Sequence, residues 1–187
     1  MNPILREFPF EFETERLTIR GPLPGDGVEM RTAVSESQAE LKEWMPWAMK
    51  VGPVEEYEAR IREKHLEFLA RKDLQLLLFL KGSNTLVGSS GLHRINWDIP
   101  KVEIGYWVRT SFARKGYITE AVVGIIDFSF NQIGAKRIEI RCDAKNSRSA
   151  AIPQRLGFIY EGTLQHEAVD RVSGELRDTM IFAKTAV

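Results

Sequence analysis

The stretch that most constrains this chain is a short basic loop, residues 109–120, set between a strand-like run and a helix-like run. Residues 102–108 before it are typical of a β-strand, and the ten residues after it repeat apolar side chains at helical spacing. The first N–H groups of a helix have no partner inside the helix, and the helix dipole adds partial positive charge there. The loop also carries Arg114, Lys115 and a glycine, Gly116, which lets the backbone approach a ligand. The pattern predicts an anion site, suited to a phosphate, at the start of this helix.

Composition and charge restrict the class of protein. The length of 187 residues suits a single domain, residues 1–187, and 43% hydrophobic with 28% charged residues is typical of a soluble globular chain. Lys plus Arg equals Asp plus Glu, so we expect no nucleic-acid partner. No apolar run reaches the length of a membrane span, the N-terminus shows no signal peptide, and Cys142 is the single cysteine. We therefore expect a cytoplasmic protein with no membrane partner.

The order of expected elements indicates an α+β fold. Seven strands are expected, over residues 14–20, 74–80, 85–94, 102–108, 136–142, 158–164 and 176–184. Helices are expected over residues 26–35, 53–71, 116–133 and 146–156, and a turn over residues 170–175. Asp26 is expected to cap the first helix and Pro53 to take the first position of the second. Antiparallel strands come first, and a strand–helix–strand–helix–strand half follows around the basic loop.

A basic turn is by itself more often a solvated connection than a phosphate site, so the flanking segments matter. Three of them resemble the GNAT superfamily of acetyl-CoA-dependent N-acetyltransferases in order and spacing: Glu103–Arg109, Arg114–Ala121, and Asn146–Ala150 followed by Leu156–Gly162. The similarity covers about residues 10–185. The segment Glu43–Trp47 and the I-G-Y-W strand resemble the RimJ/RimL-type branch, which modifies N-terminal α-amines of ribosomal proteins.

The resemblance implies a GNAT fold, a mixed and mostly antiparallel central sheet of about seven strands flanked by helices and splayed at the strand of residues 102–108. It implies acetyl-CoA as cosubstrate, no metal, and direct transfer of the acetyl group to a primary amine. We expect the amine to be an N-terminal α-amine of a protein, and the enzyme to be a monomer or a homodimer. A small-molecule amine acetyltransferase and a non-catalytic CoA-binding module remain alternatives.

The resemblance also implies which residues meet acetyl-CoA. Backbone N–H groups at residues 106–108 would hold the pantetheine and the oxyanion, aided by a bulge at Gly105 that splays the strand. The loop would hold the pyrophosphate. The expected cofactor-binding residues are Tyr106, Trp107, Val108, Arg109, Arg114, Lys115, Gly116, Tyr117, Ile118, Thr119, Asn146 and Ser149.

Three positions depart from the superfamily pattern. Ala113 stands where Gln or Arg is usual, and Ile118 stands where Gly or Ala is usual. The loop donates mainly backbone N–H groups, so these changes need not abolish binding, although Ile118 restricts how close the backbone comes. Many members carry a tyrosine acting as general acid seven residues after the motif Asn, and here that position is Pro153. The tyrosine mechanism therefore does not transfer to this chain.

The chemistry requires a base and a donor for the leaving thiolate. An α-amine with a pKa near ~7.8 is partly neutral at pH 7, so a modest base suffices. The candidate bases are Glu103, Glu139 and Glu167, with His93 as an outside choice; the alternative for Glu139 is a plain ion pair with Arg141 on a polar sheet face. Ser149 is the candidate donor to the thiolate, and the alternative for it is a helix cap.

The acceptor pocket is expected between the N-terminal helices, the hairpin of residues 166–174 and the start of the long helix. Its candidate substrate-binding residues are Trp44, Trp47 and His93, while the alternative for the tryptophans is to tie the helices to the sheet. Acids such as Glu43 would suit a polyamine, but they are also expected on solvated helix faces. Cys142 is interpreted as a strand residue and not as a nucleophile.

Overall fold

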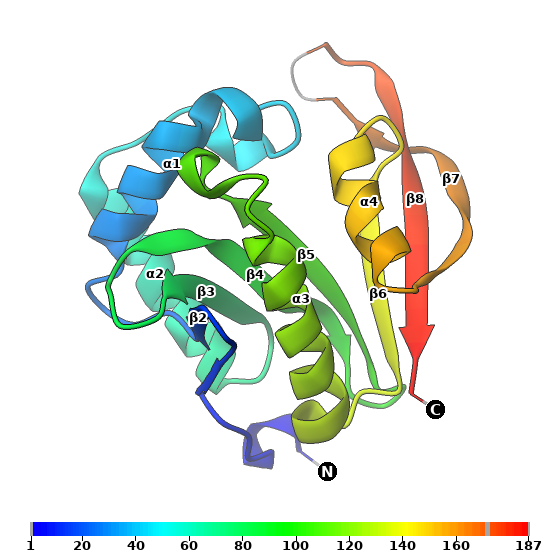
Figure 1. The fold of residues 1–187 in the computed structure, drawn as a ribbon, viewed down its shortest axis with the longest axis horizontal. Coiled ribbons are helices and arrows are strands. Elements are labelled where there is room, and N and C mark those ends of the chain that lie inside the picture. The colour runs from blue at the N-terminus through cyan, green and yellow to red at the C-terminus, as the bar shows by residue number, and fades with distance from the viewer. Residues whose placement is uncertain (1, 171–172, 187) are drawn as a thin grey trace.

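The computed structural model describes residues 2–170 and 173–186, and their strands form one mixed sheet in the order β1-β2-β3-β4-β5-β6-β8-β7 (Figure 1). The strands are β1 (Glu11–Glu13), β2 (Leu17–Arg20), β3 (Leu74–Leu80), β4 (Leu86–Asn96), β5 (Lys101–Val108), β6 (Arg137–Asp143), β7 (Ile159–Val169) and β8 (Leu176–Thr185). The helices are α1 (Gly27–Leu41), α2 (Val54–Leu69), α3 (Tyr117–Phe128) and α4 (Ser147–Arg155). Only β5 and β6 pair in parallel within the described chain.

The expected α+β fold is confirmed, with eight strands in place of about seven. The additional strand, β1, pairs Glu11 with Arg20 at the edge of the sheet. It has three residues, two of them acidic, so it carries too little pattern to be seen in the sequence. Its partner β2 begins at Leu17 and not at residue 14, while β7 extends to Val169. The expected turn over residues 170–175 includes 171 and 172, which lie outside the described residues.

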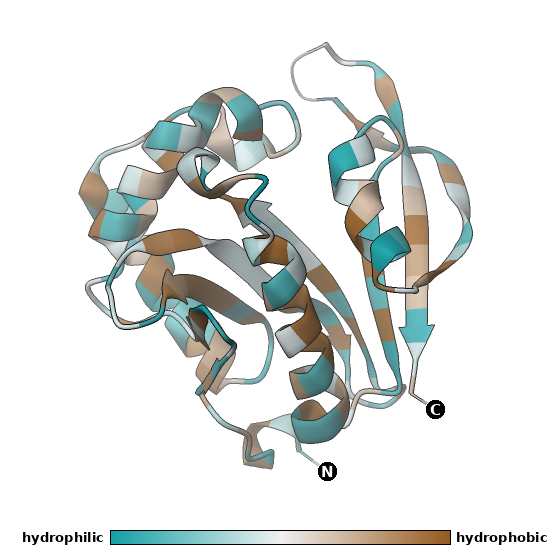
Figure 2. Ribbon diagram, in the orientation of Figure 1, coloured by the Kyte–Doolittle hydropathy of each residue, from teal (hydrophilic) through white to brown (hydrophobic). Residues whose placement is uncertain are grey.

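Two apolar layers hold the helices to the sheet (Figure 2). On one face, Ile118, Val122 and Ile125 of α3 pack with sheet residues such as Ile104 in the main core. On the other face, α1 and α2 form a second cluster with β3 and β4, made of Met30, Ala33, Val34, Tyr57, Ile61, Leu77, Phe79 and Leu86. Because α3 packs on β4 and β5 while α4 packs on β6, β7 and β8, the two helices stand on different halves of one sheet (Figure 1).

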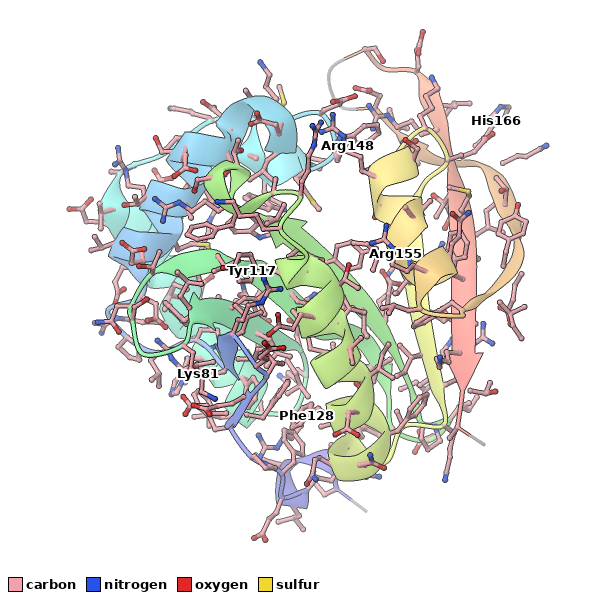
Figure 3. The ribbon with its side chains drawn as sticks, in the orientation of Figure 1. Lys81, Tyr117, Phe128, Arg148, Arg155 and His166 are labelled. Atoms are coloured by element: carbon pink, nitrogen blue, oxygen red, sulfur yellow. The ribbon has the colours of Figure 1, made fainter. Side chains whose placement is uncertain are left out.

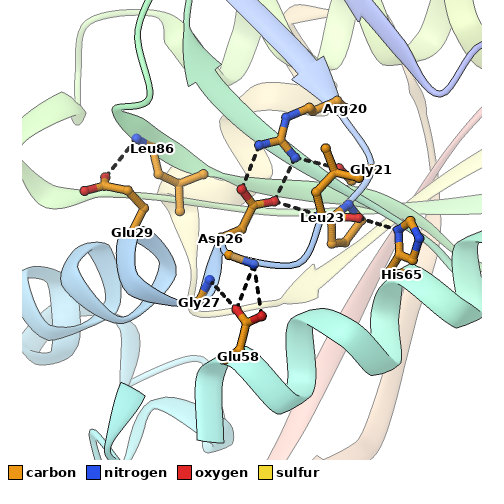
Figure 4. Close-up of polar contacts among 11 residues, drawn as sticks. Arg20, Gly21, Leu23, Asp26, Gly27, Glu29, Glu58, His65 and Leu86 are labelled. Carbon is orange, nitrogen blue, oxygen red and sulfur yellow. Dashed lines mark hydrogen bonds and ion pairs between the residues drawn. The ribbon is translucent and has the colours of Figure 1, made fainter. Parts of the chain in front are cut away.

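The start of α1 is held by neighbours and not by its own cap (Figure 4). Asp26 makes no capping hydrogen bond to the helix. Its carboxylate accepts hydrogen bonds from Nη1 and Nη2 of Arg20, each at 2.7 Å. The N–H groups of Gly25 and Gly27 donate instead to Glu58 of α2. The expected Asp26 cap is therefore wrong, because the stronger ion pair with Arg20 takes the carboxylate. Similarly, Pro53 precedes α2 as its N-cap residue and is not in the first helical position.

Candidate active site

The sheet opens where β5 and β6 separate. Their parallel pairing covers three residue pairs, and the last of these is Glu103 with Glu139. The second half of β5 therefore has no strand beside it on the β6 side, which agrees with the expected splay. The bulge expected at Gly105 is wrong, because β4 and β5 stay in register from Gly88 to His93. The irregularity lies farther along β4, between His93 and Asn96.

The loop between β5 and α3 presents a row of unused backbone donors. Within the described chain, the N–H groups of residues 114–119 donate to no protein acceptor, and the first helical bond is made by Glu120 to the carbonyl of Gly116. Arg114 (φ 61°) and Gly116 (φ 82°) are both left-handed, so the backbone curls and several of its N–H groups converge. Six free donors at a helix N-terminus are the chemistry that a pyrophosphate requires.

Helix α1 fixes the first half of this loop. Glu36 accepts the N–H of Ser111 at 2.8 Å and Nε of Arg109 at 2.6 Å, while Ser37 accepts the N–H of Thr110 at 2.9 Å. Burial alone would raise the pKa of Glu36, but the hydrogen bonds from Ser111 and Arg109 lower it. The N–H of Arg109 also donates to Val87. Arg109 thus anchors the loop through Nε and its own N–H.

Two arginines that the sequence patterns did not single out stand beside the free donors. Arg16 ion-pairs with Glu120 at 2.6 Å, donates to the carbonyl of Lys115 and lies 4.2 Å over the ring of Tyr117. Arg155 reaches from the end of α4 toward the start of α3 and donates to the hydroxyl of Thr119 at 3.4 Å (Figure 3). Both come from segments far away in the chain, so no local motif marks them.

The unusual residue Ile118 does not face this site. Its side chain is 8% exposed and packs in the main core with α3 and the sheet. It therefore leaves its own N–H open to the loop side, and its bulk does not stand between the backbone and a phosphate.

Helix α4 places Ser149 next to β5. Asn146 is the N-cap, and its side-chain oxygen accepts the N–H of Ser149 at 3.0 Å, so the capping role applies to Asn146. The Ser149 hydroxyl donates to the Tyr106 hydroxyl at 3.3 Å, and Tyr106 donates to the Ser149 carbonyl at 2.9 Å. Burial raises the pKa of Tyr106, which keeps this phenol protonated. A tyrosine hydroxyl thus stands beside Ser149 although Pro153 replaces the usual helix tyrosine.

A cavity of about 340 Å³ opens on the other face of the split. It is lined by Lys42, Glu43, Trp44, Pro46, Arg94, Glu103, Arg141, Cys142, Asp143, Glu167, Ala168, Val169, Asp170, Arg177 and Thr179. These residues come from the end of α1, from β4, β5 and β6, and from the β7–β8 hairpin. The end of α1 and the hairpin were also part of the expected pocket. Burial raises the pKa of the Cys142 thiol to about 11, so the thiol stays protonated.

The three candidate bases differ in their surroundings. Glu139 is bonded to Arg137 at 2.7 Å and does not line the cavity. Glu167 lines it, but its carboxylate is paired with Arg141 at 2.7 Å. Glu103 also lines it; its buried Oε2 makes no hydrogen bond among the described residues and has a longer ion pair with Nη1 of Arg94, at 3.4 Å. Burial raises the pKa of Glu103, against smaller lowering effects of Arg94, Arg141 and His93.

The candidate substrate-binding residues lie at different distances from the cavity. Trp44 lines the cavity, whereas Trp47 packs against Trp107 with ring centroids 5.9 Å apart. Trp47 thus ties the short helix after α1 to the sheet. His93 lies beside the cavity and not in its lining. His166, at the start of the expected acceptor hairpin, points away from the protein (Figure 3).

Arg177 closes one end of the cavity. From β8 it donates to the carbonyl of Glu43 at 3.1 Å, ion-pairs with Asp143 at 3.2 Å and with Asp170, and lies 5.4 Å from the ring of Trp44. One side chain therefore joins the end of α1, the end of β6 and the β7–β8 hairpin.

The described residues contain no cluster of His, Cys, Asp or Glu suited to a metal ion. None of the described helices is both long and apolar enough to cross a membrane.

Comparison with known proteins identifies the family. The family model described as an acetyltransferase (GNAT) domain matches residues 16–159. The chain belongs to the GNAT acetyltransferase family. It is 30% identical over 149 residues to the putative ribosomal N-acetyltransferase YdaF of Bacillus subtilis (strain 168), which covers 79% of this chain and 80% of that protein. GNAT enzymes transfer acetyl groups from acetyl-CoA to amines, so this GNAT protein is an acetyl-CoA-dependent N-acetyltransferase.

Two further likenesses agree with the family and with its fold. The ribosomal-protein-serine acetyltransferase of Escherichia coli (strain K12) is 32% identical over 80 residues, 43% of this chain and 45% of that protein. The crystal structure of the microcin C7 self-immunity acetyltransferase MccE, in complex with acetyl-CoA and AMP, has a TM-score of 0.87. It is 24% identical and covers 96% of this chain and 98% of that chain, which establishes the shared fold. The six free N–H groups and the split sheet of this GNAT chain fit the cosubstrate.

Proposed function

We propose that this enzyme, as a single domain of residues 1–187 working in the cytoplasm, acetylates the N-terminal α-amine of a protein, with ribosomal proteins as the acceptor class. Two relatives support this choice, since their names describe ribosomal or ribosomal-protein acetyltransferases. An α-amine with a pKa near ~7.8 needs less help to lose its proton than a lysine near ~10.4. A single carboxylate in the cavity is enough for such an acceptor.

The observation that carries the proposal is Glu103. Glu103 lines the cavity, its buried Oε2 has no hydrogen-bond partner in the described chain, and burial raises its pKa. A base works best when its pKa is raised toward the working pH. Glu103 therefore takes the proton of the acceptor amine, because its ion pair with Arg94 is long, at 3.4 Å, while Glu167 is bonded to Arg141 and Glu139 to Arg137, each at 2.7 Å.

The remaining roles are assigned from the same geometry. The N–H groups of residues 114–119 hold the pyrophosphate of acetyl-CoA, and the unpaired edge of β5 at residues 106–108 accompanies the pantetheine. The Ser149 hydroxyl, whose bond to Tyr106 is long at 3.3 Å, turns to donate toward the leaving thiolate, while Tyr106 donates to the Ser149 carbonyl and positions this residue. A Ser149→Ala variant with unchanged turnover would remove this leaving-group assignment.

The charges of the cavity argue against a polyamine acceptor. A polyamine needs several acids that are free to meet its ammonium groups. Here Glu167 pairs with Arg141, and Asp143 and Asp170 pair with Arg177. Of the acids expected to serve such a substrate, Glu40 is bonded to Thr110, and Glu43 alone lines the cavity.

The test is a transfer assay with labelled acetyl-CoA. The acceptors are peptides with the N-terminal sequences of ribosomal proteins, polyamines and aminoglycosides, and mass spectrometry locates the acetyl group. Each peptide contains an internal lysine and is also supplied with its N-terminus already blocked. We expect label on the free α-amine and none on the blocked peptide. Transfer confined to small amines would overturn the proposal, and acetyl-CoA binding without any transfer would favour a non-catalytic CoA-binding module.

A further inference from the structure

His93 is the cross-strand neighbour of Glu103. It lies on β4 directly opposite Glu103 of β5, so the two side chains share one face of the sheet. The side chain of His93 is 33% exposed and that of Glu103 is 17% exposed. His93 is therefore the more exposed member of the pair.

Asp73 fixes which nitrogen of His93 is left for another partner. Nδ1 of His93 lies 2.7 Å from Oδ2 of Asp73, and Asp73 is also 3.5 Å from Nζ of Lys64. Burial alone would raise the pKa of Asp73, but the hydrogen bond with His93 and the charge of Lys64 lower it. A carboxylate is an acceptor, so Nδ1 carries a hydrogen toward Asp73, and Nε2 is the nitrogen that remains for a second partner. No described residue hydrogen-bonds to Nε2.

Two glycines make room for the ring of His93. Gly91 and Gly105 are cross-strand partners, one step along the sheet from the pair of His93 and Glu103. A Cβ on Gly91 would lie 2.7 Å from Cε1 of His93, and a Cβ on Gly105 would lie 3.2 Å from Cδ2. The imidazole therefore lies across this glycine pair. Gly105, expected from the sequence to make a bulge, serves instead to seat His93.

The real irregularity of β4 supplies the remaining neighbour. Pairing shifts between His93 and Asn96, and Arg94 has a left-handed φ of 47°. A bulge re-aims a side chain, and here it brings Nη1 of Arg94 to 3.4 Å from Oε2 of Glu103. The charged groups around the pair are thus Asp73 with Lys64 beside His93, and Arg94 of β4 with Arg141 and Glu139 of β6 around Glu103.

We propose that His93 relays the proton from Glu103 to solvent, with Asp73 as the residue that positions it. An ammonium acceptor and acetyl-CoA give an amide, the free thiol of CoA and one proton. The C–N bond forms as the C–S bond breaks, and the thiolate takes one proton of the former ammonium. The other passes to Glu103, then to Nε2 of His93 and to water. This relay rests on the proposed role of Glu103 as base.

The test is chemical rescue of His93→Ala. Turnover is measured in dilute non-nucleophilic buffer with increasing imidazole, and in parallel with pyrazole, which has the same shape but is a much weaker base. We expect kcat to fall by about 10- to 100-fold, at or below the lower range for acid–base groups. Imidazole should restore a large part of the rate and pyrazole little. Asp73→Asn should lower kcat less. His65→Ala serves as control, because His65 meets the carbonyl of Pro22, far from the cavity.

His93→Gln keeps a polar partner for Asp73 but cannot accept a proton, so it separates the relay from packing. Circular dichroism and acetyl-CoA affinity should match the parent for both His93 variants. Full activity of either variant, or equal rescue by pyrazole and imidazole, overturns the relay. Glu103→Gln tests the base separately: if it is inactive while His93→Gln is fully active, the relay fails and the proposed function stands.

Discussion

The anion loop and the acceptor cavity are built by opposite means. The proposed donors of the loop of residues 109–120 are the consecutive backbone N–H groups of residues 114–119, so they are neighbours in the sequence. The cavity acts through side chains of five separate segments, from Lys42 to Thr179, and most of its charges are paired with each other. The comparison teaches that side chains should matter little in the loop and greatly in the cavity.

The largest effect is expected from Glu103→Gln in the cavity. Loss of the base should lower kcat by about 10²- to 10⁴-fold, while affinity for acetyl-CoA, measured by calorimetry, stays unchanged. Glu139→Gln is the control, because Glu139 is tied to Arg137 outside the cavity and should retain near-parent turnover. Turnover of Glu103→Gln within a few-fold of the parent would rule out this base.

The pH dependence of the parent enzyme also tests whether Glu103 is the base. Burial raises the pKa of Glu103, so its basic form is lost as pH falls through that raised value. The rate kcat/KM should therefore decline at a higher pH than an ordinary glutamate, near ~4.3, would give. In Glu103→Gln this limb should disappear from the profile. A limb that is identical in both enzymes would assign the titration to another group.

The sequence predicted the loop better than the cavity for a physical reason. A strand, a glycine and a helix start are local features, so Gly116 and the free donors could be read from one segment. The partners of two candidate carboxylates could not, since Arg141 reaches Glu167 and Arg94 reaches Glu103 from a different strand. Arg16 was missed likewise, because it meets Glu120 across 104 positions of the chain.

Local patterns also failed where a partner from another element decided what a residue does. The sequence predicts a bulge at Gly105, but its missing side chain makes room for His93 on the next strand. It predicts a cap at Asp26, but Arg20 takes the carboxylate. In both cases the residue type was informative and its partner was not, because the partner is set by tertiary packing.

Gly116→Ala should have the next largest effect and tests the loop. Gly116 has φ 82°, a region that costs a side-chain-bearing residue about 1–2 kcal/mol. Relaxing that strain turns the neighbouring N–H groups away from the pyrophosphate, so Kd for acetyl-CoA should rise by about 5- to 30-fold. Gly134→Ala is the matched control: its φ is 76°, but it lies beyond the other end of α3.

Thermal unfolding distinguishes the two glycine variants from a general loss of fold. Both substitutions strain the backbone alike, so both should lower Tm to a similar extent. Only Gly116→Ala should also weaken acetyl-CoA binding at a temperature where both are folded. Equal affinity of the two variants for acetyl-CoA would show that the donors of residues 114–119 do not hold the cosubstrate.

Arg177→Ala should have a smaller effect than Gly116→Ala, and it tests the side chains of the cavity. The arginine joins Glu43, Asp143 and Asp170 across one end of it. Its loss should raise KM for the acceptor by about 3- to 10-fold, as expected for partly exposed ion pairs, with little change in Kd for acetyl-CoA. Arg62→Ala removes an exposed pair with Glu58 and serves as control. An unchanged acceptor KM would mean that this end of the cavity does not contact the acceptor.

The smallest effect should come from Lys115→Ala, although Lys115 is one of the two cations that marked the loop. Its side chain lies near the ring of Phe112, and the exposed charge adds only screened attraction to the backbone donors. Kd for acetyl-CoA should rise by less than about fivefold, and the difference should shrink further as salt increases. A loss as large as that of Gly116→Ala would reverse the comparison, because it would make a side chain, and not the backbone, the principal holder of the pyrophosphate.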